Sequence, residues 1–160
     1  VRDAVLCVGG GLDAKLGGMS PDVNANRRAV YLPINRAALY EMFSTFDYVE
    51  TANHIEQRPT TTVPHQALFL LNSPIVHMQA TAIAKEVIAQ YDAPDQRIEA
   101  IFRTLYARRP TEAELSRSVD FIAAAEVELA SVQAVPQRNL QVWSALCRSM
   151  IAANEFVYID

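Results

Sequence analysis

Histidine can bind a metal or move a proton near neutral pH, so the three histidines are the first candidates for chemistry. They are His54, His65 and His77. No two of them stand four residues apart, the spacing that places two metal ligands on one face of a helix, and no cysteine pair accompanies them. We therefore predict ordinary surface or hydrogen-bonded histidines, with no metal site and no cofactor in this stretch of chain.

Four carboxylates precede a run of threonines, and a facing pair of them would suit hydrolase chemistry. Many glycoside hydrolases use two carboxylates across a cleft as acid and base. The same spacing is typical of a solvated acidic loop, which is the interpretation we favour. The sequence identifies no catalytic residue, and the G-x-S-x-G motif of acyl enzymes is missing. The four carboxylates are Glu41, Asp47, Glu50 and Glu56.

The segment from Arg58 to Asn72 has the residue types of a binding site for an anion or for sugar hydroxyls. Threonine hydroxyls and backbone amides lie beside Pro64 and a predicted helix start, and helix N-termini bind anions. Capping of that helix explains the same residue types more simply. The candidate binding residues are Arg58, Thr60, Thr61, Thr62, His65, Gln66 and Asn72.

Two cysteines, Cys7 and Cys147, are separated by most of the chain. Cys147 lies among apolar residues of a predicted helix, where a free thiol packs well as a small hydrophobic group. A disulfide between the two becomes the alternative if the protein is exported. The sequence leaves both states open, and it contains no C-x-x-C motif for zinc or haem attachment.

The composition is typical of a globular chain, with 51% hydrophobic and 20% charged residues. The formal net charge is -4, and the two signs are interspersed, so no basic stripe is present to bind the phosphates of a nucleic acid. No apolar run reaches the roughly 18 residues that a membrane-spanning helix needs. We therefore predict one domain that binds no nucleic acid and has no membrane span.

The C-terminal half carries apolar side chains at helical spacing in four stretches, residues 74–91, 96–107, 112–131 and 137–152. Serine favours the N-cap position and proline the first helical position, so Ser73 and Pro74 predict a helix start. Thr111 and Glu114, three residues apart, predict a capping box. Short connections predict an antiparallel bundle of three to four helices. The predicted inward side chains are Ile75, Met78, Ala82, Ile83, Val87, Ile88, Ile98, Ile101, Phe102, Leu105, Leu115, Val119, Ile122, Ala125, Leu129, Leu140, Trp143, Leu146, Cys147, Met150 and Ile151.

The N-terminal half is less regular, and we expect it to pack on the bundle as loops and short helices. Glycines at positions 9, 10 and 11 end the first predicted helix. The fold class is therefore mainly α, with an irregular N-terminal half against a C-terminal helical bundle. The predicted elements outside the bundle are a helix end at 1–8, a turn at 12–16, an extended segment at 27–33, helices at 36–46 and 66–72, and an extended tail at 156–159.

Four sequence blocks occur in an order that resembles a known family. They are RRAVYLP at 27–33, TTTVPHQALFLLNSP at 60–74, RPTEAEL at 109–115 and NEFVY at 154–158. Together they resemble the planctomycete-specific C-terminal domain of unknown function, over most of the chain. That domain closes large exported proteins that often carry a cytochrome c-like segment. In proteins of that family, the position of His65 is often occupied by a different residue.

The resemblance implies a periplasmic or cell-surface location, and haem held elsewhere in the parent protein. It supplies no catalytic residues. Because the chain also begins at Val1 without a methionine, we expect residues 1–160 to be one domain at the C-terminal end of a longer multidomain protein. We interpret it as a non-catalytic structural or interaction module whose partners are other domains of that parent. The alternative is a hydrolase-like enzyme domain that acts on polysaccharide.

Overall fold

The computed structural model describes residues 1–20, 22–35, 39–46 and 64–158. Within these ranges the chain is mainly helical, as predicted, and its β-structure is one isolated parallel bridge between Asp13 and Arg27. A 3₁₀ turn covers Ala29–Tyr31. The α-helices are α1 (Arg2–Val8), α2 (Glu41–Thr45), α3 (Pro64–Asn72), α4 (Pro74–Gln90), α5 (Pro94–Tyr106), α6 (Glu112–Glu128), α7 (Val135–Ile151) and α8 (Asn154–Val157).

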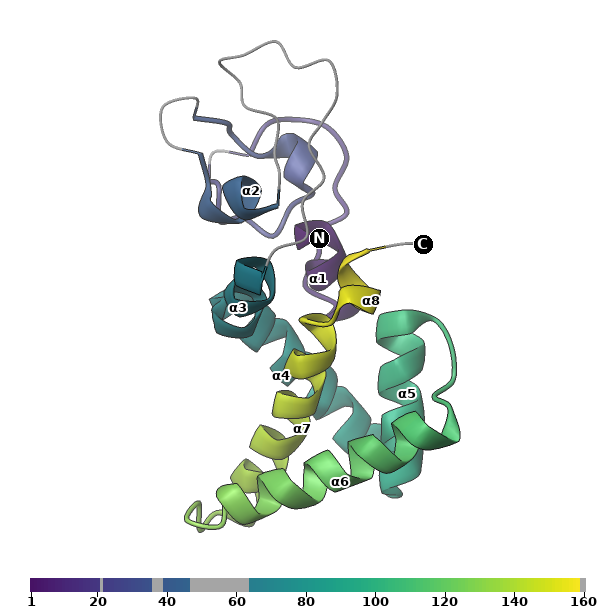
Figure 1. Ribbon diagram of the computed structural model, residues 1–160. Helices are drawn as coiled ribbons and strands as arrows, with labels where there is room; N and C mark the ends of the chain where they lie inside the picture. The colour runs from purple at the N-terminus through teal and green to yellow at the C-terminus, as the bar shows by residue number, and fades with distance from the viewer. Residues whose placement is uncertain (21, 36–38, 47–63, 159–160) are drawn as a thin grey trace.

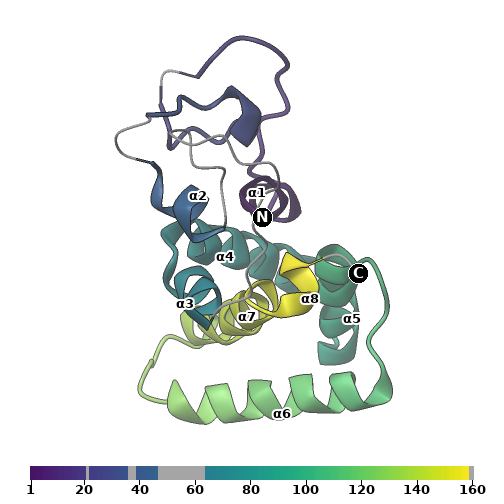
Figure 2. The same cartoon turned by 45° about the horizontal axis from the view of Figure 1, so that its top comes forward.

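Helices α4 and α7 form the central pair of the molecule (Figure 1). Helix α6 crosses one end of this pair, and α5 lies beside the pair. The short helices α1 and α2 and the N-terminal loops occupy the opposite end, which Figure 2 shows from a second direction. The irregular N-terminal half thus packs on the C-terminal helices as the sequence predicts.

The core lies where α4, α5 and α7 meet. Ile83, Ile98 and Val142 are buried there, and Trp143 is only 2% exposed, which confirms its predicted place in the core. The Arg97 guanidinium covers the Trp143 ring at 5.3 Å from its centre. Burial of these large apolar side chains supplies most of the stabilisation of such a bundle.

Helix α4 presents a face partly different from the predicted one, and α6 departs from its predicted stripe at one residue. On α4, Met78 is 59% exposed, while Val76 and Ala80 are buried, because α7 packs along that side of the helix. On α6, Val119 is 42% exposed, but the other predicted inward residues, Leu115, Ile122, Ala125 and Leu129, are buried or half-buried against the core. Helix α6 therefore contacts the rest of the protein along the predicted stripe, and Ser118 and Ile122 are its buried residues.

The two predicted helix starts differ in their capping. At α6, the Thr111 hydroxyl accepts from the Glu114 backbone N–H at 3.3 Å, and the Glu114 carboxylate accepts from the Thr111 N–H at 2.8 Å, which confirms the capping box. At α4, Ser73 occupies the N-cap position, but its side chain makes no capping hydrogen bond. The predicted N-cap position of Ser73 is confirmed. The predicted capping hydrogen bond from its side chain is wrong.

Glycine permits α1 to end against α4. A Cβ atom on Gly9 would lie 2.1 Å from Oε1 of Gln79 and 2.6 Å from its Cβ, too close for any side chain. The Gly10 and Gly11 amides then donate to carbonyls of Cys7 and Leu6, which closes α1 as predicted. The glycines thus end the helix and also let it approach α4.

Arginine side chains hold the N-terminal loops together. Arg2 is buried and donates to the Arg27 and Ala25 carbonyls, and the Asp3 carboxylate accepts from the Ala29 N–H at 2.8 Å. Arg27 in turn donates to three loop carbonyls, those of Lys15, Gly17 and Gly18. These contacts order backbone that forms neither helix nor sheet.

Four local predictions require correction. Residues 12–16 form no turn and instead supply Asp13 to the bridge with Arg27, and the segment 27–33 contains the 3₁₀ turn where an extended run was predicted. The helix expected over 36–46 begins at Glu41, although residues 36–38 lie outside the described ranges. Of the extended tail expected over 156–159, Phe156 and Val157 belong to α8 and Tyr158 is extended, while residue 159 lies outside the described ranges.

Among the described residues, no single helix is long and apolar enough to cross a membrane. Helices α3 and α4 reach that length and composition only together, and they are bent by 62° at their junction.

Candidate functional site

Helix α3 carries three of the seven candidate binding residues. His65 and Gln66 lie in its first turn, and Asn72 is its last residue. The other four candidates, Arg58, Thr60, Thr61 and Thr62, fall outside the residues that the structure describes. The carboxylates Asp47, Glu50 and Glu56 and the histidine His54 fall outside them as well.

Gln66 ties three parts of the fold together. Its side chain is 4% exposed, its Nε2 donates to the Thr45 carbonyl at 3.0 Å, and its Oε1 accepts from the Tyr158 hydroxyl at 2.7 Å. The end of α2, the start of α3 and the residue after α8 are thereby joined. Both ends of the amide are bonded inside the protein, so we assign Gln66 a structural role.

His65 and Asn72 line one shallow hollow between α2 and α3, with a volume of about 410 Å³. Glu41 and Thr45 form its other wall. Asn72 Nδ2 donates to the Leu68 carbonyl of its own helix at 2.9 Å, and His65 is exposed. Within the described residues, no three side chains of the histidine, cysteine, aspartate or glutamate type gather as a metal site would require.

A larger cleft of about 790 Å³ opens between α6 and the α4–α7 pair. Its volume lies in the range of ligand-binding clefts, roughly 300–1,000 Å³. The cleft exists because α6 packs along one stripe and leaves Phe121 38% exposed on the side that faces α7. Residues of three helices line it, among them His77 and Thr81 from α4, Phe121 and Glu128 from α6, and Leu140 and Arg148 from α7.

His77 and Arg148 meet at one end of this cleft. His77 Nε2 lies 2.9 Å from the Leu71 carbonyl oxygen, and Arg148 Nη1 lies 3.3 Å from each ring nitrogen of His77. A carbonyl oxygen only accepts, so Nε2 carries the proton. The equal distances to the two ring nitrogens place Nη1 over the face of the imidazole ring. The end of α3 thus orients His77, and His77 positions the guanidinium at the cleft wall.

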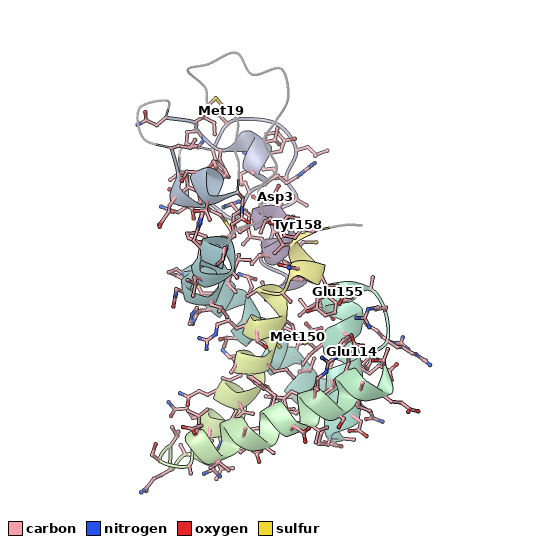
Figure 3. The ribbon with its side chains drawn as sticks, viewed as in Figure 1. Asp3, Met19, Glu114, Met150, Glu155 and Tyr158 are labelled. Atoms are coloured by element: carbon pink, nitrogen blue, oxygen red, sulfur yellow. The ribbon has the colours of Figure 1, made fainter. Side chains whose placement is uncertain are left out.

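Arg108 organises a second charged cluster, at the start of α6. Its guanidinium forms paired hydrogen bonds of 2.6–2.8 Å with the carboxylates of Glu114 and Glu155, which approach each other from α6 and α8 (Figure 3). The bonds from Arg108 lower the pKa of the Glu114 carboxyl to about 2. Burial, with the nearby charge of Glu155, raises the pKa of Tyr106 to about 12, and its hydroxyl donates to the Met150 carbonyl. Through these bonds Arg108 connects the start of α6 to α8, so we assign the cluster a structural role.

The two cysteines are free thiols in the structure. Cys147 is fully buried on α7, and burial raises its pKa to about 12, so it stays protonated and packs as an apolar group. Cys7 is exposed on α1. The sequence left open both a disulfide and free thiols, and in the structure the two thiols are free.

Local residue spacing did not predict the cleft, because its polar residues come from three helices that are far apart in the chain. His77 was interpreted as an ordinary histidine, and Arg148 was not singled out. One signal was present: Phe121 and Ala124 lie outside the predicted apolar stripe of α6, so that helix is apolar on more of its surface than a single contact line can cover.

Comparison with known proteins gives one family. A family model described as PSD1, protein of unknown function (DUF1553), matches residues 1–122. No curated protein and no solved structure matches the chain. Since the match spans about three quarters of the sequence and includes the blocks at 27–33, 60–74 and 109–115, the chain belongs to the DUF1553 family of proteins of unknown function.

Proposed function

We propose that this chain is a non-catalytic structural or interaction module of a larger exported protein. Its partner is another domain of the same parent, which docks in the cleft between α6 and the α4–α7 pair. The observation that carries the proposal is the half-exposed α6, a helix of 17 residues that buries only Ser118 and Ile122 in the described structure. A partner that covers the exposed side of such a helix is expected to protect its amides further.

The apolar surface around the cleft supports an interface. Phe121 is 38% exposed at the cleft, and the half-buried Leu129 and Leu140 line it as well. Exposed apolar side chains that gather beside a cleft are a common mark of a protein contact surface. The titratable groups outside the core whose pKa values are clearly displaced, Glu114, Tyr106 and Arg108, lie in the cluster at the start of α6 and away from the cleft lining.

The family resemblance supports the wider setting. We propose a periplasmic or cell-surface location, a planctomycete source, and a cytochrome c-like segment that holds haem elsewhere in the parent. Residues 1–160 then form one domain at its C-terminal end, in contact with the other domains and with no nucleic acid.

Hydrogen exchange tests the docking. Exchange of α6 amides is measured by mass spectrometry in the 160-residue chain and in the full parent protein. We expect α6 to exchange slower in the parent by about tenfold or more, with α5 as the internal control because it lies outside the cleft lining. Equal exchange of α6 in the two proteins would refute docking at this cleft.

A second measurement tests the non-catalytic part of the proposal. The full parent is assayed on a panel of polysaccharides, with His65→Gln as the variant. We expect no turnover that depends on His65. Turnover that is lost in His65→Gln while the melting temperature stays unchanged would identify an enzyme domain instead.

A further inference from the structure

Arg148 is a half-buried cation in the cleft, and no carboxylate of the described residues pairs with it. Arg103 pairs with Glu99 at 2.7 Å and Arg108 with Glu114 at 2.7 Å, whereas Arg97 and Arg138, like Arg148, have no such ion pair within the described part of the chain. Among the residues that the structure describes, the partner recorded for the Arg148 guanidinium is the His77 ring. Its position in the last turn of α7 suits a positive charge, but the helix dipole does not explain why it lies at the cleft wall.

The Arg148 guanidinium is the positively charged donor of the cleft, which the side-chain amides of Gln137 and Gln141 also line. The Thr81 hydroxyl donates to the His77 carbonyl at 2.8 Å, and the Ser144 hydroxyl donates to the Leu140 carbonyl at 2.6 Å, so both are used within their own helices. Nη1 of Arg148 faces His77, which leaves Nε and Nη2 for another group. A guanidinium offers these donors as a planar fork that fits a carboxylate.

The charge of the cleft differs between its two ends. Glu128 belongs to the end near the start of α7, where Gln137 also lines the cleft. Gln137 and Arg148 are eleven residues apart on α7, about 16 Å along the helix axis. The end that holds Arg148 is therefore positive, while the middle of the cleft is walled by apolar groups such as Phe121 and Leu140.

We infer that the cleft receives an acidic, apolar segment of the partner domain, whose carboxylate binds Arg148 while its apolar side chains pack on Phe121 and Leu140. This inference rests on the proposed docking and names the chemistry of the docked segment. A single carboxylate with apolar neighbours complements the positive end and the apolar walls. A densely charged anion fits poorly, because Glu128 lies in the same cleft.

The first test uses a carboxylate probe and needs no variant. Hexanoate and hexanol are titrated separately into the 160-residue chain, after a cooperative melting transition has shown that it is folded. Nuclear magnetic resonance follows the Arg148 Nε–H and His77 ring signals. We expect hexanoate to bind tighter than hexanol by about tenfold or more, because hydrogen bonds to a charged group are the stronger kind. Equal affinity for the two probes would overturn the inference.

The second test uses matched variants in the full parent. Arg148→Gln removes the charge, and Arg138→Gln on the same helix removes a charge that does not line the cleft. We expect Arg148→Gln to reduce the protection of α6 from hydrogen exchange by about tenfold and Arg138→Gln to leave it unchanged. Arg148→Lys keeps the charge without the planar fork, so an intermediate loss is expected. Equal protection in all three variants would overturn the inference.

The outcomes separate the inference from the proposed function. If α6 is protected in the wild-type parent but hexanoate binds no tighter than hexanol, the docking is supported and the proposed carboxylate contact with Arg148 is refuted. No protection of α6 in the wild-type parent removes the docking itself, whatever the probes do.

Discussion

At the scale of single residues, the segment that looked most like a binding site contains a structural amide. Gln66 is buried and hydrogen-bonded at both ends, to the Thr45 carbonyl and the Tyr158 hydroxyl, while its neighbour His65 is exposed at the start of the same helix. Two adjacent candidates thus have different roles. The alternation follows from the helix, which turns successive side chains in different directions.

Replacement of the two neighbours should separate these roles. Gln66→Leu removes the part-buried hydrogen bonds to the Thr45 carbonyl and the Tyr158 hydroxyl and should lower the free energy of unfolding by about 1–3 kcal/mol. His65→Gln should change it by less than about 0.5 kcal/mol, as is usual for a surface substitution. Urea unfolding followed by circular dichroism measures both. A stability loss in His65→Gln as large as that in Gln66→Leu would contradict the assignment.

The Arg108 cluster predicts how stability depends on pH. The folded-state pKa of Glu114 is about 2, below its ordinary value of 4.5, so its contribution is complete above about pH 4.5 and is lost as the pH falls toward 2. Urea unfolding between pH 6 and pH 2.5 should show this loss. In Glu114→Gln, the part of the loss that comes from this carboxyl should vanish. An identical pH dependence in the two proteins would show that the ion pair adds nothing to stability.

At the scale of elements, the helix starts show why residue type alone does not establish a cap. Thr111 and Ser73 both precede a helix, yet only Thr111 accepts a hydrogen bond from its helix. The Thr111→Ala variant should therefore lose about 1 kcal/mol, the usual contribution of an N-cap. Ser73→Ala should lose less than that, since no capping bond is removed.

Thermal unfolding of the two variants tests this contrast. The wild-type chain and an exposed substitution such as Glu112→Gln serve as controls. A larger drop in melting temperature for Ser73→Ala than for Thr111→Ala would show that the Ser73 hydroxyl, although it does not cap α4, stabilises its buried surroundings.

At the scale of the whole molecule, stability is concentrated in α4, α5 and α7, and α6 lies at the margin. Trp143→Ala should lower the free energy of unfolding by about 3–5 kcal/mol, because it removes a large side chain from the centre of the core. Phe121→Ala, at a site 38% exposed in the cleft, should have a much smaller effect.

Chemical denaturation of these two variants, in the 160-residue chain, measures the difference. If Phe121→Ala is as destabilising as Trp143→Ala, then α6 belongs to the main core and the cleft is closed in solution. A small effect in the isolated chain with a loss of α6 protection in the full parent is the result that an interaction surface predicts.

The sequence by itself determined the mainly helical fold, the α5 and α7 stripes that contain Ile98 and Trp143, the end of α1 at the glycines, and the capping box at Thr111. Each depends on residues close in the chain, since helical periodicity and capping act over a few positions. The exposed faces at Met78 and Val119, the two bonds of Gln66, and the meeting of His77 with Arg148 were decided by the tertiary structure alone. They depend on which helices become neighbours, and no local pattern records that contact.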